Sequence, residues 1–478
     1  MAYLTKKTRP VQALGIVGAA LLWAAPASAD MTLDEVLAIA YTNNPTIQAQ
    51  REQVRSADEQ IAEAFAGFLP SVEVTGTITK AWTHNSKGKI KTGDFGFPGF
   101  NIPIPSSDSE SNPRALTTTI DQPIFTGGRN INAMKQVRAS VQGNRAQLTD
   151  VEQQIFLQTV AAYMDVIANQ SVVELNENNV KVLDQQRTAT QDRFDVGELT
   201  RTDVAQAEAR LSGVQSRLIA AESDLRSAEA ALAKLIGAEV DALTDPATLP
   251  ATPETEDTAQ ELARDLSPQV IAARAFAEAA KSAIKVAGGE WLPTVSVRAQ
   301  LEYSRDTSAL SSIFNQTTWT RSVSGVLNWK FFQGGAVLSR MRQAQFDAAR
   351  ARTQISEAER ASAEAVTNAW TGLKAAKATI RASQAAVDAN EIALEGVRQE
   401  ADVGARTTLD VLDAEQELLD SRVTLVQARR NEVVATYQLL AATGQLTAGY
   451  LDLPVEQAVV TNRADGLFNF SSASDASE

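Results

Sequence analysis

Two aspartates, Asp410 and Asp413, have the most evident chemical potential in this sequence, and they lie three residues apart. On a helix this spacing puts both carboxylates on one face. Repeated around a pore entrance, such a pair would concentrate cations, repel anions and raise the pKa of its members through like-charge repulsion. A single pair could instead supply the two carboxylates of a glycosidase. It could equally be a solvated helix face with no chemical role.

The composition argues against enzymatic chemistry. The 478 residues include no cysteine and one histidine, His84, so neither a Ser-His-Asp triad nor a cluster of histidine or cysteine metal ligands can form. A glycosidase would need a pocket, which the long helical patterns described below are not expected to supply. We therefore expect no enzyme, no metal site and no cofactor. The net charge of −14 disfavours a nucleic-acid partner.

Residues 1–29 have the pattern of a secretory signal peptide. Lys6, Lys7 and Arg9 precede an apolar stretch that ends at the small-residue sequence Ala27-Ser28-Ala29. The stretch is shorter than the roughly 20 apolar residues of a membrane-spanning helix, and no other run approaches that length. The sequence therefore predicts an exported protein that is not an α-helical membrane protein.

The rest of the sequence is an internal duplication. Residues 195–211 and 402–418 are identical at nine of seventeen positions, at an offset of 207, and the motif Phe-x-Gly-Gly that begins at Phe125 recurs at the same offset. Leu-Pro at Pro70 recurs at an offset of 223, so the first copy has 16 additional residues between Pro70 and Phe125. A period near 200 is too long for a solenoid. It predicts two similar half-proteins with a pseudo-twofold relationship.

Each half is expected to run helix, strand, strand, long helix, turn, long helix. We place the first repeat at 30–242, a proline-rich linker at 243–267, the second repeat at 268–446, and a C-terminal segment with a disordered end at 447–478. The long helices are predicted at 129–192 and 336–400, each followed by a shorter helix with sustained heptads. Sustained heptads predict helices packed side by side as in coiled coils.

Four segments have the alternating pattern of strands. Val295 to Tyr303 and Val323 to Phe331 alternate apolar and polar residues over about ten positions, which is typical of transmembrane barrel strands and also of half-buried sheets. The first copy shows the same pattern more weakly, and its polar region from His84 to Arg114 predicts a long external loop. Four strands cannot close a membrane barrel, because the smallest barrels use eight and open edges in lipid are costly. A barrel would therefore need several chains.

With these motifs in both copies, the sequence resembles the TolC family over residues 31–446. The resemblance implies a mixed α and β fold with four transmembrane strands per chain. Three chains would form a homotrimer with a 12-stranded barrel in the outer-membrane lipid of a Gram-negative bacterium. A long α-helical coiled-coil tunnel would continue it through the periplasm. It also implies an exit duct for a tripartite efflux pump or type I secretion system, with a periplasmic adaptor and an inner-membrane transporter as partners.

Several residues lie where strand patterns meet helix patterns, where glycine and proline permit a sharp change of direction. We predict these as structural swivels: Pro70, Gly127, Gly128, Pro293, Gly334 and Gly335. The Asp-Val-Gly turns are predicted to end the long helices at glycine, with Thr200 and Thr407 capping the next helix.

The resemblance assigns further roles around these turns. Adaptor contact is implied at the hairpin tips, which comprise Val196, Gly197, Leu199, Val403 and Gly404. Asp410 and Asp413 would form an acidic ring at the periplasmic entrance. Arg406 would help to close that entrance with Thr202 or Asp203 as partners, although Ala401 stands where the family has a tyrosine of the closing network.

One alternative stays open at this stage, a soluble periplasmic coiled-coil scaffold or adaptor. It accounts for the helices and the signal peptide, but not for four amphipathic strands with aromatic residues on their apolar faces. The sequence does not distinguish small-molecule efflux from protein secretion, because a passive duct takes its cargo from its transporter.

Overall fold

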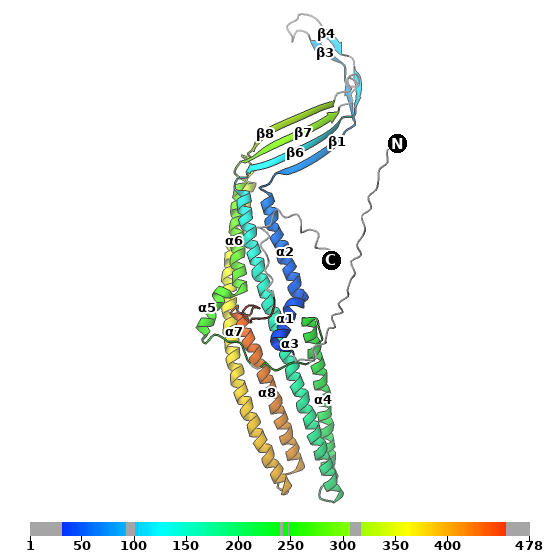
Figure 1. The fold of residues 1–478 in the computed structure, drawn as a ribbon, viewed down its shortest axis with the longest axis vertical. Helices are drawn as coiled ribbons and strands as arrows, with labels where there is room; N and C mark the ends of the chain where they lie inside the picture. The colour runs from blue at the N-terminus through cyan, green and yellow to red at the C-terminus, as the bar shows by residue number, and fades with distance from the viewer. Residues whose placement is uncertain are drawn as a thin grey trace, which may run out of the picture.

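The chain forms an elongated molecule with a β-sheet at one end and two helical hairpins at the other (Figure 1). The computed structural model describes residues 31–91, 101–104, 106–239, 242–246, 248–305 and 317–455. The predicted signal peptide and the predicted disordered end of the C-terminal segment lie outside the described residues. Among the residues described, no helix combines the length and the apolar character needed to cross a membrane.

The two repeats predicted from the sequence correspond element by element. The first contains α1 (Leu33–Asn43), α2 (Pro45–Ala66), β1 (Ser71–Ile78), β6 (Arg114–Phe125), α3 (Arg129–Asp195) and α4 (Arg201–Ile236). The second contains α5 (Glu256–Leu266), α6 (Pro268–Gly289), β7 (Thr294–Arg305), β8 (Thr317–Asn328), α7 (Ala336–Asp402) and α8 (Thr408–Ala442). The longest helices, α3 and α7, have 67 residues each. At about 1.5 Å per residue they are roughly 100 Å long.

The second repeat begins earlier in the chain than the sequence predicts. Helix α5 begins at Glu256, 223 residues after the start of α1, so the second repeat starts there rather than at 268. The linker is correspondingly shorter. All three of its prolines precede α5, and a capping box formed by Thr255 and Thr258 starts the helix immediately after them. The prolines therefore mark only the segment that precedes the helix.

The four main strands form one antiparallel sheet in the order β1-β6-β7-β8, as expected for two adjacent hairpins. The prediction of a loop from His84 to Arg114 is wrong for much of its length. That region contains strand segments paired as two ribbons, which are β2 (Ala81–Asn85) with β5 (Ser107–Ser111) and β3 (Gly88–Lys91) with β4 (Asn101–Ile104). These ladders depend on hydrogen bonds between backbone groups rather than on an apolar side-chain pattern. The polar composition of this region therefore does not indicate its strands.

The sheet has one apolar and one polar face. The register pairs Val72 with Ile120 and Val295 with Leu327, which places the apolar positions of all four strands on the same side. On the opposite side, Arg298 of β7 forms an ion pair with Asp121 of β6 at 2.8 Å. The apolar face is bare in the single chain, since Val323 is 77% exposed.

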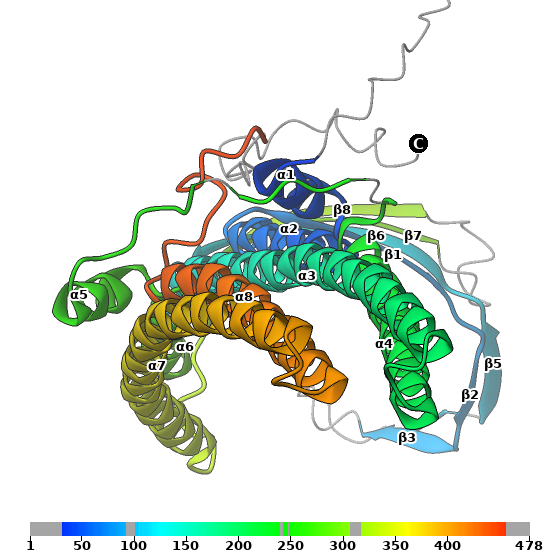
Figure 2. The same cartoon turned by 90° about the horizontal axis from the view of Figure 1, so that it is seen from below.

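The helices form a curved wall. Viewed from below, α7, α8, α3 and α4 follow an arc, with α1 and α2 on its convex side (Figure 2). The largest buried cluster lies midway along the wall, where α1 and the C-terminal segment cover α3, α4 and α8, and it includes Phe156, Tyr163 and Tyr437. The Tyr163 hydroxyl is within hydrogen-bond distance of the carbonyls of Met31 at 3.0 Å and Thr244 at 2.5 Å. This cluster holds helices of the two hairpins, α3 and α4 of the first and α8 of the second, against one another.

Candidate functional site

The candidate site lies at the far ends of the helical hairpins, where α3 turns into α4 and α7 into α8. Both turns pass through a glycine in the left-handed region, with φ of +83° at Gly197 and +78° at Gly404. The amide of the residue after each glycine donates back into the last helical turn, from Glu198 to the Arg193 carbonyl and from Ala405 to the Glu400 carbonyl. The predicted glycine stops are therefore confirmed.

The first turn of each returning helix is a capping box. The hydroxyl of Thr407 donates to the Asp410 carboxylate at 2.7 Å, and that carboxylate also accepts from the Thr407 amide at 2.9 Å. Thr200 and Asp203 repeat this arrangement in the first hairpin. Both predicted caps are confirmed, and both aspartates stabilise a helix N-terminus, where negative charge is favourable.

The cap also sets the electrostatics of Asp410 within the chain. Hydrogen bonds from the Thr407 side chain and amide lower the pKa of Asp410. Thr200 lowers the pKa of Asp203 in the same way. Asp410 therefore stays ionised to a lower pH than an ordinary aspartate. The expectation that like-charge repulsion raises the pKa concerns a ring formed by several copies, and it stays a prediction.

Asp413 has a different partner from Asp410. Its carboxylate forms an ion pair with the guanidinium of Arg210, which belongs to α4 of the other hairpin. Seven residues further along each helix, Arg217 and Asp420 approach at 3.8 Å. Sequence reasoning missed these two arginines. The equal seven-residue spacing of both partners is the signal that could have found them.

Arg406 is bound within its own hairpin. Its Nε donates to the Glu400 carboxylate at 2.8 Å, and this interaction raises the pKa of Arg406. Within the chain the Asp203 carboxylate is held by Thr200, and Thr202 is exposed. A link from Arg406 to Thr202 or Asp203 stays a prediction.

The hairpin tips expose apolar side chains. Val196 is 74% exposed and Val403 is 80% exposed, at equivalent places in the two turns. Leu199 is half-buried, and both turn glycines are exposed. Each hairpin tip thus presents one apolar side chain to solvent.

The predicted swivel glycines lie at the opposite ends of α3 and α7, whereas Pro70 lies between α2 and β1, and Pro293 lies between α6 and β7. All four glycines predicted there have positive φ, from +58° at Gly334 to +82° at Gly335. The two copies differ in their surroundings. A Cβ added at Gly127 would meet the Gly289 carbonyl and lie 2.9 Å from Leu292 Cβ, whereas a Cβ at Gly335 would meet nothing within 4 Å.

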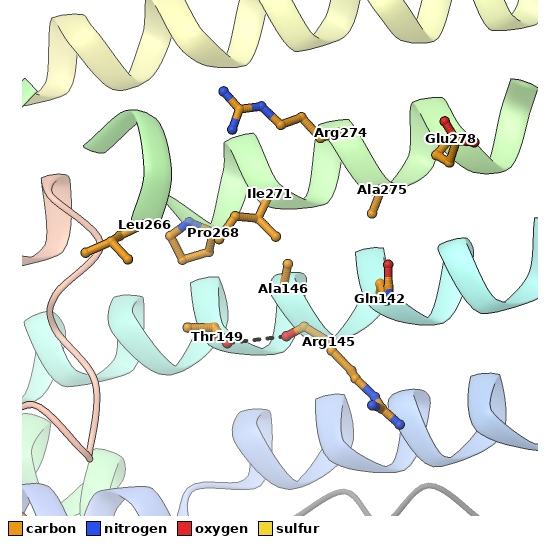
Figure 3. A pocket seen from close by; sticks show the side chains of 10 residues that line it. All are labelled: Gln142, Arg145, Ala146, Thr149, Leu266, Pro268, Ile271, Arg274, Ala275 and Glu278. Carbon is orange, nitrogen blue, oxygen red and sulfur yellow. Dashed lines mark hydrogen bonds between the residues drawn. The ribbon is translucent and has the colours of Figure 1, made fainter. Parts of the chain in front are cut away.

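Open grooves run between the helices, contrary to the expectation that such helices supply none. One of about 600 Å³ lies between α3 and α6, and its floor includes Ala146, Ile271 and Ala275. Arg145 and Arg274 point away from it toward α2 and α7 (Figure 3), where they pair with Asp58 at 3.0 Å and Glu359 at 2.9 Å. Within the described part of the chain, no cluster of three or more histidine or acidic side chains is arranged to hold a metal ion.

Comparison with known proteins identifies the family. The model of the family described as "Outer membrane efflux protein" matches residues 36–238 and 259–445. The chain belongs to this family. The unmatched gap coincides with the proline-rich linker between the repeats. The chain is therefore an outer-membrane export protein that extends into the periplasm, and the alternative of a soluble scaffold finds no support.

Named relatives cover nearly the whole chain. The outer membrane efflux protein BepC of Brucella suis is 33% identical over 426 residues, which are 89% of this chain and 88% of BepC. The outer membrane protein TolC of Vibrio cholerae is 25% identical over 87% of this chain and 91% of its own length. The alkaline protease secretion protein AprF of Pseudomonas aeruginosa is 24% identical over 87% of this chain and 85% of its own length.

Solved structures support the fold. CusC, described as forming a transmembrane channel, superposes with a TM-score of 0.72 at 18% identity and covers 87% of this chain and 92% of its own. The outer membrane protein VceC of Vibrio cholerae gives a TM-score of 0.69 at 20% identity, covering 86% of this chain and 96% of its own. The predicted mixed α and β, TolC-like fold is thereby confirmed.

Proposed function

We propose that three copies of this chain form a passive exit duct, whose sheets close a 12-stranded barrel in the outer membrane and whose helices form a periplasmic tunnel. The observation that carries this proposal is the sheet itself. Its apolar face is bare, and the outer edges of its terminal strands β1 and β8 pair with no other strand among the described residues. In lipid each unpaired backbone group costs several kcal/mol. Edge-to-edge pairing of neighbouring copies removes both edges.

The helical wall supports the same assembly. It is curved, so copies placed side by side would enclose a tunnel, and α7 and α4 lie at its two margins (Figure 2). The hairpin ends would then converge on the axis. In that position three Asp410 and three Asp413 side chains would form an acidic ring at the entrance. Because Arg210 neutralises Asp413 within each chain, Asp410 would carry most of the ring's unpaired charge.

We assign the exposed tips to contact with a periplasmic adaptor protein. Val196 and Val403 supply the apolar surface, and Gly197 and Gly404 allow a close approach of another backbone. The adaptor would link the duct to an inner-membrane transporter. Among relatives, one is named for efflux and another for alkaline protease secretion, so both small molecules and proteins are candidate cargo.

Closure of the entrance would depend on links at the hairpin ends. Arg406 is one candidate, through Thr202 or Asp203 of the first-copy hairpin. Breaking such links would let the second-copy hairpins move outward and widen the pore. Unchanged single-channel conductance in the Arg406→Ser variant would show that Arg406 does not help to close the entrance.

The first test of the proposed function is single-channel recording of the detergent-purified protein in a planar bilayer. We expect small, cation-selective openings that lose selectivity in the Asp410→Ala, Asp413→Ala double variant. A matched control is the Glu357→Ala, Glu364→Ala variant, which removes two exposed carboxylates of α7 remote from the entrance. Absence of conductance from assembled wild-type protein would overturn the duct. If the double variant keeps the wild-type conductance and cation selectivity, the acidic ring is rejected but the duct is not.

A further inference from the structure

A cleft of about 480 Å³ lies where the helical wall meets the sheet. Helices α3, α6 and α7 all end or begin at this junction (Figure 1). A space of this size admits a small organic molecule. The residues that line the cleft come from segments far apart in the chain, and they include Arg129, Glu290, Thr294, Asn328, Lys330 and Arg340.

The cleft lies on the polar face of the sheet. Thr294 and Asn328 form the register pair of β7 and β8 that is closest to the helices. The next pair, Val295 with Leu327, belongs to the apolar face, and successive residues of a strand point to opposite faces. In the proposed assembly the polar face surrounds the lumen. Each chain would therefore contribute one such cleft to the wall of the channel.

Positive charge exceeds negative charge in this cleft. Its lining includes the cations Arg129, Lys330 and Arg340, whereas Glu290 is its only acidic residue. Arg340 and Glu290 form an ion pair and offset each other. The Nε of Arg129 donates to the Thr126 carbonyl at 3.1 Å, which is a neutral acceptor. Among the described residues, neither Arg129 nor Lys330 has a carboxylate partner, so two positive charges stay uncompensated.

The helix ends add to this positive potential. Helices α3 and α7 both begin at the junction, and the partial positive charge of a helix N-terminus favours an anion. Their N-cap residues, Gly128 and Gly335, form no side-chain hydrogen bond, and neither helix has an acidic residue in its first turn. Helices α4 and α8 differ, because Asp203 and Asp410 occupy their first turns. Helix α6 ends at the junction with the opposite polarity, but two starting helices outweigh it.

We infer that this cleft binds the carboxylate or phosphate group of a small anionic molecule in the lumen of the duct, with Arg129 and Lys330 as its direct partners. The inference rests on the proposed function, because only a closed assembly turns the polar face of the sheet into a lumen. The terminal nitrogens of a guanidinium bind a carboxylate or phosphate with two parallel hydrogen bonds, and an ammonium group adds a compact charge. The Asn328 amide lines the same space and offers a neutral donor.

The cleft and the acidic entrance lie at opposite ends of α7. Arg340 is near the start of this helix, Asp410 follows its end, and 67 residues of helix are roughly 100 Å long. An anionic cargo molecule would therefore meet an attractive site only after it has passed the acidic end of the duct. The three clefts of a trimer would raise the concentration of such molecules on the exit side.

The test uses citrate, a small trivalent anion, and the assembled protein in detergent at low ionic strength, where exposed charges are least screened. Titration calorimetry measures citrate affinity, and single-channel recording measures the reduction of current by citrate. We expect wild type to bind citrate and to be blocked by it. Lys330→Gln should weaken binding and block at least about tenfold, as expected for the loss of a charge-assisted hydrogen bond. Trimethyl citrate, which carries no charge, should neither bind nor block.

Arg298→Gln is the matched control. Arg298 is a cation on the same polar face, but it does not line the cleft, and it is paired with Asp121 at 2.8 Å. Its replacement should leave citrate affinity unchanged. Arg129→Gln should weaken binding as Lys330→Gln does. Because Arg129 packs against Gly289, its replacement can also disturb assembly, whereas Lys330 is exposed and lies outside the helices and strands. The Lys330 variant therefore decides the outcome.

Two results would overturn the site. One is equal citrate affinity of wild type and Lys330→Gln. The other is citrate binding without any block of a conducting channel, which would place the bound anion outside the conduction path. Conductance in wild type without citrate binding rejects this inference and leaves the duct intact. Absence of conductance from assembled wild type rejects the duct, and the lumenal position of the cleft with it.

Discussion

Arg210 of α4 and Asp413 of α8 form an ion pair between the two helical hairpins of a single chain. Arg217 and Asp420 repeat the contact seven residues later at 3.8 Å. The side chains are 40 to 67% exposed, and exposed pairs contribute about 0.2–1 kcal/mol each. Such a ladder is too weak to hold the fold, but strong enough to bias an equilibrium between two arrangements of the hairpins.

The first prediction concerns this ladder. The Arg210→Gln, Arg217→Gln variant should favour the open entrance by up to about fivefold per pair lost, because each pair contributes at most about 1 kcal/mol. Single-channel recording measures the open fraction and the conductance. The charge-swapped variant, Arg210→Asp with Asp413→Arg, should restore the wild-type open fraction.

A matched control separates this effect from a general loss of charge. Arg187→Gln removes an exposed ion pair with Asp184 that lies within α3 and joins no hairpins. It should leave gating unchanged. Equal gating in the ladder variant and wild type would show that these ion pairs do not hold the entrance.

The second prediction concerns acid. Because Thr407 lowers the pKa of Asp410, the carboxylate loses its charge only below the ordinary aspartate pKa of about 3.9. Cation selectivity should therefore persist as the pH falls to about 4. Thr407→Val removes the hydroxyl and should move the loss of selectivity to higher pH. Reversal potentials from pH 7 to pH 3 measure this, and coincident curves for both proteins would contradict it.

The third prediction concerns the stability of the central region. Glu152 of α3 is largely buried beside Arg51 of α2, at 3.8 Å, and Arg51 lies 4.3 Å from the centre of the Tyr41 ring. Burial raises the pKa of Glu152 from 4.5 to about 7, although Arg51 opposes the shift. The folded chain thus retains a proton that the unfolded chain releases. Stability should fall as the pH rises from about 4.5 to about 7.

Glu152→Gln should remove this dependence. Relative to wild type, the variant should gain roughly 3 kcal/mol per chain between pH 4.5 and pH 7, at about 1.4 kcal/mol per pKa unit. Thermal unfolding in detergent, followed by tryptophan fluorescence at several pH values, measures the difference. Glu52→Gln, at an exposed position of α2, is the control. If the difference in stability between Glu152→Gln and wild type does not change with pH, the raised pKa of Glu152 is rejected.

The fourth prediction uses the unequal swivels. An alanine at Gly127 or Gly335 must adopt a positive φ, which costs about 1–2 kcal/mol. At Gly127 the new methyl group also collides with the Gly289 backbone and Leu292. Gly127→Ala should therefore lower the dissociation temperature of the assembled protein well beyond Gly335→Ala. Equal dissociation temperatures of the two variants would indicate that the backbone around Gly127 shifts enough to accommodate the methyl group.

Much of the architecture follows from local sequence. The duplication, the extents of α3 and α7, the glycine stops at Gly197 and Gly404 and the caps at Thr200 and Thr407 depend on periodicity and on residues close in the chain. The four main strands followed from alternation, which sets their faces before any partner is known. The paired strands within 84–114 were missed because their ladders rest on backbone hydrogen bonds.

The sequence by itself determined which residues lie at the hairpin turns, which residues cap the helices that follow, and which residues lie on each face of the sheet. Only the tertiary structure decided which charges meet. Asp410 binds its own cap and Asp413 binds Arg210, 203 residues away, although the two aspartates share one helix face. The pairing of Arg114 with Arg305 likewise depends on the register of strands far apart in the chain. Ion pairs and cross-strand neighbours act over a few ångströms in space, and sequence patterns specify periodicity but not those distances.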